Sequence, residues 1–276
     1  MAAPSAQTLQ RLANQTGHQP GTLEKVLRLL DLLQEIARDR FLGDRPVLKG
    51  GTALNLFHLG LDRLSVDIDL NYVGALDRAA MEAERPDVDA AIDRLLVSKG
   101  YGIRRRPGEH AGGKWLARYA SALGGNATLE VDVNRMARQP LFGMTRMRAL
   151  PLGGIRAKDV LVLDLHEIVA GKLVALVDRH AARDLFDARR IPQAPMRVRS
   201  LTPGSWMPML PLVSWGPGEG GFAAFDCAQC DRQGPGSVGV GTGLARWVGQ
   251  FGRFLGFGRQ FRSRANFLRG RGAGLC

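Results

Sequence analysis

The chain has 276 residues, 45% of them hydrophobic, which is enough for one or two domains with a buried core. It contains no apolar run long enough to cross a bilayer, no signal-peptide pattern and only three cysteines, so we exclude a membrane protein and a disulfide framework and expect a cytoplasmic protein. The formal net charge is +12, but the residues after Ile191 hold ten arginines and only three acids, so more than half of that charge lies in the tail.

The first predicted element is a helix. Residues 22–41 carry apolar side chains at the spacing of an amphipathic helix, with Thr22 as its predicted N-cap. Residues 1–21 precede this pattern, and we interpret them as a flexible N-terminus.

A glycine turn follows that helix. The apolar pair Val47 and Leu48 leads into Gly50, Gly51 and Thr52, and a second helical pattern starts there. A strand that turns through glycines into a helix can present backbone N–H groups to an anionic phosphate. An ordinary tight turn is the alternative, because two glycines before a helix are common.

The segment SVDIDL, residues 65–70, predicts a half-buried strand. Successive side chains of a strand point to opposite faces, so Asp67 and Asp69 share one face while the apolar residues share the other. Ser65 lies one step earlier on the acidic face.

A helix over residues 87–99 and three strand-like segments come next. The segments are YGIRRR, KWLARYAS and ATLEVDVN, and a glycine-rich turn over residues 123–126 predicts that the last two form a hairpin. Glu130 and Asp132 lie on one face of the last segment. An exposed sheet face would explain this, but carboxylates that converge with Asp67 and Asp69 are best stabilised by divalent cations. A pair of Mg²⁺ ions held in this way can align an attack on a nucleoside triphosphate.

The residues from Asp164 to Arg190 predict one long helix. Lys172, Arg179 and Arg183 are separated by seven and four residues and so would share a stripe, with Asp187 near its edge. A solvated charged face is one interpretation. The other interpretation is a clamp for a triphosphate, and we favour it because the chain also carries a carboxylate face of the kind that binds metal ions.

The tail, residues 192–276, is rich in glycine, proline and arginine and shows no sustained period, so it cannot easily form a packed core. We expect either a disordered segment or the product of a coding sequence read out of frame. Cys227 and Cys230 form a weak metal signal, since no second cysteine pair accompanies them.

The stretches KGGTALNLFHLGLDRLSVDIDLNY and KLVALVDRHAARDLFD together resemble the AbiEii/AbiGii toxin family, with MenT-type toxins as relatives, within the polymerase β-type nucleotidyltransferase superfamily. The resemblance covers residues 25–191. It implies an α/β fold in which a mixed sheet flanked by helices forms the nucleotidyltransferase core, followed by a helical segment. It also implies that Lys172 and Asp187 match the active-site lysine and aspartate of the family.

From the residues and the resemblance we expect the following site. Asp67, Asp69 and Asp132 hold Mg²⁺ or Mn²⁺, and Asp132 assists deprotonation of the acceptor, with Glu130 as the alternate. The residues expected to bind the NTP are Gly50, Gly51, Thr52, Ser65, Lys172, Arg179 and Arg183.

The expected function is transfer of a nucleotide from an NTP to a hydroxyl, by resemblance that of a tRNA 3′ end, in a toxin–antitoxin system with a cognate antitoxin. Nucleotidylation of protein hydroxyls and an inactive, truncated family member are the alternatives. The expected division is a flexible N-terminus (1–21), a nucleotidyltransferase core (22–135), a connecting strand with the long helix (136–191) and the tail (192–276).

Overall fold

The computed structural model of the chain describes residues 4–107, 112–179 and 181–191. Contacts within the chain gather residues 1–177 and 183–194 into one compact unit, which contains the sheet and its helices. The predicted tail, with Cys227 and Cys230, lies outside the described residues.

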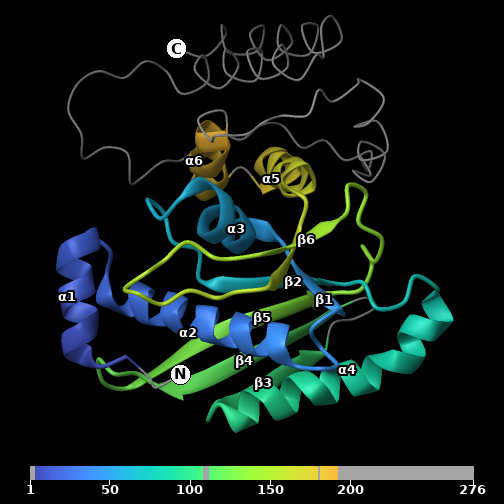
Figure 1. Cartoon of the computed structure of the whole chain (residues 1–276), viewed down its shortest axis with the longest axis horizontal. Coiled ribbons are helices and arrows are strands. Elements are labelled where there is room, and N and C mark those ends of the chain that lie inside the picture. Colours follow the sequence, from blue (N-terminus) through green and yellow to red (C-terminus); the bar gives the residue numbers. More distant parts are fainter. Residues whose placement is uncertain (1–3, 108–111, 180, 192–276) are drawn as a thin grey trace, which may run out of the picture. The chain divides into compact units, whose positions relative to one another are not determined.

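Within the described residues the strands form one seven-stranded mixed sheet with the order β3-β4-β5-β2-β1-β7-β6 (Figure 1). Strand β2 is antiparallel to β1 on one side and parallel to β5 on the other. The bounds of the strands are β1 Pro46–Leu48, β2 Asp67–Tyr72, β3 Gly102–Pro107, β4 Gly112–Ala120, β5 Asn126–Asn134, β6 Met144–Met147 and β7 Val160–Leu163.

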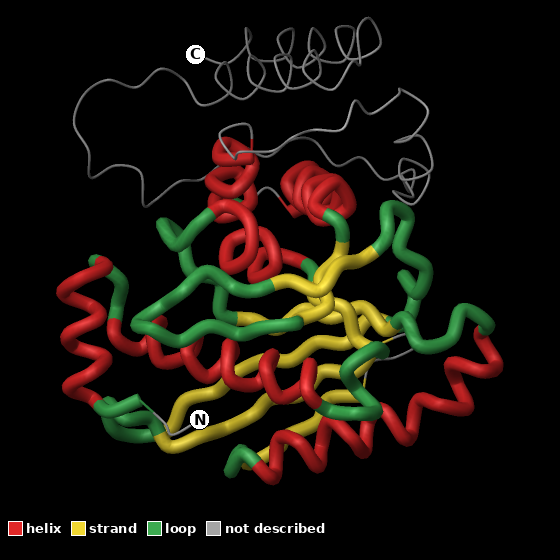
Figure 2. The backbone as a smooth tube through the Cα atoms, viewed as in Figure 1, coloured by secondary structure: helices red, strands yellow, loops and turns green. Residues whose placement is uncertain are grey.

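The helices surround this sheet, and the long helices α2 and α4 run along it (Figure 2). The described helices are α1 Ala6–Thr16, α2 Pro20–Arg38, α3 Gly50–Ala53, which continues as the π-helix η1 Leu54–Leu59, α4 Arg78–Ser98, α5 Leu165–Arg179 and α6 Ala182–Arg190. Within the described part of the chain, no helix combines the length and apolar character that a membrane span requires.

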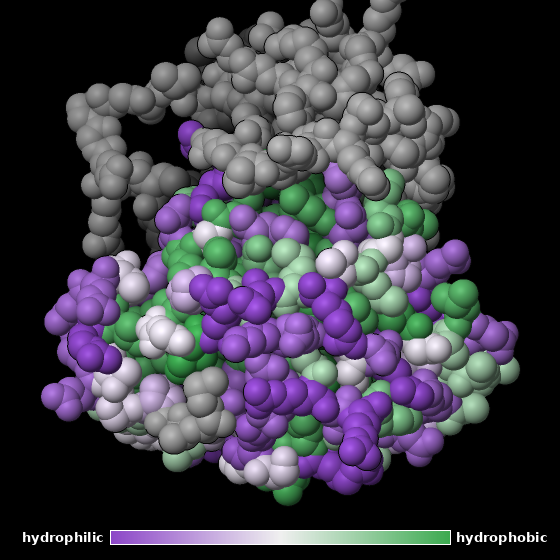
Figure 3. All heavy atoms as spheres, in the orientation of Figure 1, coloured by the Kyte–Doolittle hydropathy of each residue, from purple (hydrophilic) through white to green (hydrophobic). Residues whose placement is uncertain are grey.

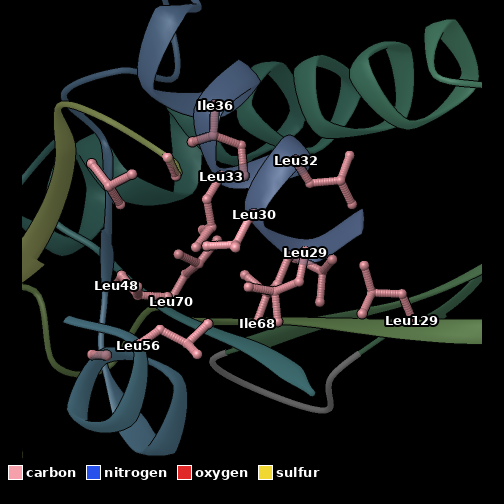
Figure 4. Packing of buried hydrophobic residues seen from close by; sticks show 14 of the residues in the cluster. Leu29, Leu30, Leu32, Leu33, Ile36, Leu48, Leu56, Ile68, Leu70 and Leu129 are labelled. Carbon is pink, nitrogen blue, oxygen red and sulfur yellow. The ribbon is translucent and has the colours of Figure 1, made fainter. Parts of the chain in front are cut away.

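The core lies between α2 and one face of the sheet. Leu29, Leu30 and Leu33 of α2 point toward Ile68 and Leu70 of β2, and all five side chains are almost fully buried (Figure 4). Hydrophilic side chains gather on the surface over α1 and α2 (Figure 3), as expected of helices whose apolar side is buried. The alternate residues of β2 and β5 are therefore left for the opposite face of the sheet.

The structure corrects the predicted N-terminus. Residues 6–16 form helix α1, in which the Ser5 side chain accepts a hydrogen bond from the backbone N–H of Thr8 and Leu9 and Leu12 are buried. The prediction of a flexible segment was wrong. Two leucines at helical spacing are enough to stabilise a short helix when a neighbouring helix buries them. Helix α2 accordingly begins earlier than predicted, at Pro20 rather than after Thr22.

The three predicted strand segments correspond to β3, β4 and β5, and the last two form the predicted hairpin. The helix predicted over residues 87–99 is longer and begins at Arg78. Its start is fixed by Asp77, whose side chain accepts a hydrogen bond from the backbone N–H of Ala80.

The single long helix predicted from Asp164 to Arg190 is also wrong. The chain forms two helices there, α5 and α6, after the short strand β7. The break lets α6 change direction, with consequences for the charged residues that both helices carry.

Candidate active site

The predicted acidic strands lie side by side. In the parallel register of β2 and β5, Asp67 is opposite Glu130 and Asp69 is opposite Asp132. Registered neighbours in a sheet share a face, so the four carboxylates gather on the side away from the apolar core. Glu130 and Asp132 are 44% and 46% exposed, which leaves this face open to a ligand.

The surroundings of Asp69 disfavour its negative charge. Burial raises the pKa of the Asp69 carboxyl. The negative charges of Asp67 and Asp132 act in the same direction, while Lys49 and Lys172 oppose the shift. A positive ligand on this face would relieve the repulsion.

The glycine turn is attached directly to β2. The backbone N–H of Lys49 donates to the carbonyl oxygen of Asp69 at 2.9 Å, and the Thr52 hydroxyl donates to the carbonyl oxygen of Asp67 at 2.5 Å. Gly50 has a φ of +71°, and a Cβ there would collide with the Asp69 carboxylate. The turn therefore lies against the acidic face, and the buried Thr52 hydroxyl is engaged in holding it there.

Ser65 lies next to the glycine turn in space. It precedes β2 rather than belonging to it, and a Cβ on Gly51 would stand 3.0 Å from its hydroxyl oxygen. The structure thus brings Gly50, Gly51, Thr52 and Ser65 together next to β2, and their contact with an NTP stays a prediction.

Lys172 lies in a buried ionic cluster between α5 and α6. Its ammonium nitrogen is 3.0 Å from an oxygen of Asp184 and 3.0 Å from an oxygen of Asp187. The lysine is 8% exposed and both aspartates are fully buried. Because α6 is a separate helix, side chains fifteen residues apart in sequence meet here.

Two residues that the sequence analysis did not single out complete this cluster. Arg63 donates to both oxygens of Asp187, at 2.7 and 2.6 Å, and the side-chain amide of Asn55 donates to Asp187 at 3.3 Å. Burial works to raise the pKa of Asp187, but the Arg63 hydrogen bonds and the Lys172 charge outweigh it and hold that pKa below its ordinary value. Asp187 therefore joins α6 to the segment between the glycine helix and β2.

The predicted stripe of Lys172, Arg179 and Arg183 is not formed, because the chain breaks into two helices between Arg179 and Ala182. Arg183 is exposed and lies on α6, whereas Lys172 is buried on α5. The side chain of Arg179 lies outside what the structure describes. A clamp made of these three residues on one helix was wrong, because it assumed a continuous helix.

The chemistry of the carboxylates fits a divalent cation, although their present positions do not enclose one. Within residues 4–107, 112–179 and 181–191, no three histidine, cysteine, aspartate or glutamate side chains converge closely enough to hold a metal ion. The Lys114 ammonium occupies part of the face, 2.8 Å from Glu130 and 3.9 Å from Asp132. The donor set is of the type that Mg²⁺ prefers, and Asp69 is crowded by like charges that a cation would neutralise.

Solved structures of other proteins are similar to this chain, among them the two that follow. JHP933 from Helicobacter pylori is 22% identical, with coverage of 58% of this chain and 62% of that chain and a TM-score of 0.40. MenT4, the nucleotidyltransferase toxin Rv2826c from Mycobacterium tuberculosis H37Rv, is 22% identical, with coverage of 65% and 62% and a TM-score of 0.42. The chain thus spans less than two thirds of either protein.

No curated protein matches the sequence. The family described as nucleotidyl transferase AbiEii toxin, type IV toxin–antitoxin system, matches residues 31–201, which is more than half of the chain and includes both β2 and the Lys172–Asp187 cluster. The chain therefore belongs to the AbiEii nucleotidyltransferase toxin family.

Proposed function

We propose that the chain transfers a nucleotide from an NTP to the terminal hydroxyl of a tRNA, and that a cognate antitoxin restrains this activity. The observation that carries the proposal is the acidic face of β2 and β5 with the glycine turn against it. Membership of the family supports the toxin role. The tRNA acceptor and a cytoplasmic location are proposed together with this role.

In this proposal Asp67, Asp69 and Asp132 would hold Mg²⁺ or Mn²⁺, which when bound supplies neutralisation of the triphosphate and alignment of its reacting groups. The positive φ of Gly50 turns the backbone at the start of the helix, where N–H groups without intrahelical partners can donate to phosphate oxygens. Ser65, whose hydroxyl lies close to Gly51, would make a further contact with phosphate.

In this proposal Lys172 supplies a positive charge that is held in a fixed position near the carboxylates. Asp184 and Asp187 hold its ammonium group, and its charge acts on Asp69 across the site. A fixed cation near the carboxylates stabilises negative charge that develops on the leaving group.

The reaction forms a bond between the acceptor oxygen and the α-phosphorus of the NTP. The bond from that phosphorus to the bridging oxygen breaks, and pyrophosphate leaves with its electron pair. The proton of the acceptor hydroxyl passes to a carboxylate. We assign this role to Asp132 rather than Glu130, because Glu130 is in close contact with the Lys114 ammonium at 2.8 Å.

The test is incubation of the full chain with radiolabelled NTP, Mg²⁺ and either bulk tRNA or total protein. We expect label in tRNA, no label with EDTA, and no label with Asp69→Asn. Asp44→Asn is the matched control, because Asp44 is 82% exposed and lies outside the acidic face.

Two results would contradict the proposal in different ways. Label in protein and none in RNA would identify protein nucleotidylation. Mg²⁺-dependent NTP binding without any transfer would identify an inactive family member.

A further inference from the structure

We propose that the outer part of the acidic face, on β3 and β4, binds the polynucleotide acceptor next to its reacting end. The inference rests on the proposed function and names where the acceptor lies. It is carried by the register of four adjacent strands and by a basic hollow on the face that they share.

The register places acidic and basic side chains on one continuous face. Arg104 of β3 is paired with Leu116 of β4, Leu116 with Glu130 of β5, and Glu130 with Asp67 of β2. The residues that alternate with these on β4 and β5 are the buried ones, among them Trp115 and Val131. One face of these strands therefore packs into the core, and the other runs from carboxylates on β2 and β5 to arginines on β3 and β4.

An open hollow of about 450 Å³ lies at the arginine end of this face. The residues that line it are Gly102, Ile103, Arg104, Leu116, Arg118 and Thr128. That volume is in the range of sites for small organic ligands, and a nucleotide unit falls within it.

The two arginines of the hollow are available to a ligand. Both are exposed, and neither forms an ion pair or hydrogen bond with another part of the chain that the structure describes. Guanidinium groups bind phosphate oxygens in a two-pronged manner and also stack on bases. Leu116 supplies an apolar surface between them, and the Thr128 hydroxyl supplies a donor.

The distance between the hollow and the carboxylates suits a site for the acceptor rather than for the NTP. Adjacent strands are about 4.8 Å apart, so Arg104 lies about 14 Å from Asp67, three strands away. The glycine turn and Lys172 are on the other side of β2 from β5, so the expected triphosphate site is remote from the hollow. A strand whose terminal hydroxyl reaches the carboxylates would place a preceding nucleotide over Leu116.

Lys114 connects the two ends of the face. It lies on β4 opposite Asp132 and is ion-paired with Glu130. A polyanion that approaches the carboxylates meets repulsion, and cations along the path offset it. A linear polyanion with one charge per unit suits this row of cations better than a folded protein that offers a single hydroxyl.

The experiment compares the double variant Arg104→Ala/Arg118→Ala with the matched control Arg38→Ala/Arg78→Ala. Arg38 and Arg78 are 68% and 81% exposed and lie on α2 and α4, outside the hollow. The probe for binding is a fluorescent single-stranded RNA ending in CCA, followed by anisotropy over a range of salt concentrations. The probe for turnover is bulk tRNA with labelled NTP.

We expect the double variant to weaken RNA binding and raise the KM for tRNA by about tenfold or more, with unchanged NTP affinity. Log affinity should fall less steeply with log salt, the slope becoming less negative by about 1.4, since each lost phosphate contact contributes about −0.7 on a single strand. Arg104→Lys/Arg118→Lys should restore part of the affinity because it keeps the charge.

Other outcomes separate the inference from the proposed function. Unchanged RNA affinity with intact NTP binding would overturn the inference and leave nucleotide transfer standing. A parallel loss of NTP affinity would also overturn it, because the hollow would then serve the triphosphate. If the wild-type chain labels only protein and the double variant reduces that labelling, the face binds a protein acceptor and the inference is wrong. If nothing is labelled at all, transfer fails as the function, and the anisotropy measurement alone decides RNA binding.

Discussion

At the scale of single residues, Gly50 is the position where backbone geometry and site chemistry coincide. Its φ of +71° is costly for any residue with a side chain, and an added Cβ would collide with the Asp69 carboxylate. We predict that Gly50→Ala lowers the free energy of unfolding by about 1–2 kcal/mol from the backbone alone and also abolishes nucleotide transfer. Urea unfolding and the labelling assay measure the two effects.

The chain supplies a matched control for this substitution. Gly125 has a φ of +70°, and a Cβ there meets nothing within 4 Å. Gly125→Ala should therefore show the same backbone cost with full activity. If Gly50→Ala also keeps its activity, the position of the Asp69 carboxylate does not depend on the turn and the proposed site is wrong.

The burial of Lys172 decides what its substitution does to stability. On a solvated helix, alanine would be tolerated there, because it is a good helix former. In the structure, Lys172 lies 3.0 Å from two fully buried aspartates. We predict that Lys172→Ala lowers the free energy of unfolding by about 3 kcal/mol, since breaking a buried pair leaves charge uncompensated. Thermal melting measures the loss.

The control for this prediction is Lys99→Ala. Lys99 pairs with Asp31 and Glu35 at 3.2 Å each but is 20% exposed, so its removal should cost about 1 kcal/mol or less. Equal losses in the two variants would show that burial of the Lys172 cluster does not matter to stability.

At the scale of elements, the attachment of α6 depends on one carboxylate. Asp187 binds Arg63 and Lys172, and its pKa is held below the ordinary value of 3.8. A depressed folded pKa stabilises the protein above the unfolded pKa, and this stabilisation is lost as the pH falls through the folded pKa. We predict that the difference in unfolding free energy between the wild type and Asp187→Asn is constant above about pH 5 and shrinks below about pH 4. Urea titrations at a series of pH values measure it, and a pH-independent difference would contradict the assigned charge state.

The elements also show which parts of the fold and site the sequence could predict. Strands β2 and β5 were predictable because alternation of acidic and apolar residues is a local pattern, and the shared acidic face followed from it. The separation of α5 from α6 was not, because the charged residues fit a helical period on both sides of the break. On one helix Lys172 and Asp187 would be about 22 Å apart. In the structure their charged atoms are 3.0 Å apart.

Contacts between distant segments were equally hidden. Arg63 and Asp187 are 124 residues apart in sequence, and no local period connects them. Helix α1 escaped prediction for a related reason, since its two buried leucines are stabilised by α2 and not by a long apolar pattern of their own. Tertiary packing stabilises this helix, which helix propensity alone did not indicate.

At the scale of the whole unit, the sheet separates stability from chemistry. One face carries the apolar side chains that pack under α2 (Figure 4). The other face carries the carboxylates, Lys114 and the basic hollow. Charged residues crowded on one face repel each other, and the core on the opposite face offsets that cost. Neighbouring residues of a single strand should therefore affect different properties.

Ile68 and Asp69 test this separation most directly, because they are adjacent in β2 and point to opposite faces. Ile68 is fully buried against α2, and Ile68→Ala should lower the free energy of unfolding by about 2–5 kcal/mol while the folded fraction still binds NTP. Asp69→Asn should abolish transfer and leave the melting temperature equal to or above that of the wild type, because burial and like charges already disfavour its ionised form. Melting curves and Mg²⁺-dependent NTP binding, measured on both variants, give the comparison. A large loss of stability in Asp69→Asn would show that this carboxylate is held by favourable contacts within the fold, and the acidic face would then be a structural feature rather than a site that awaits a cation.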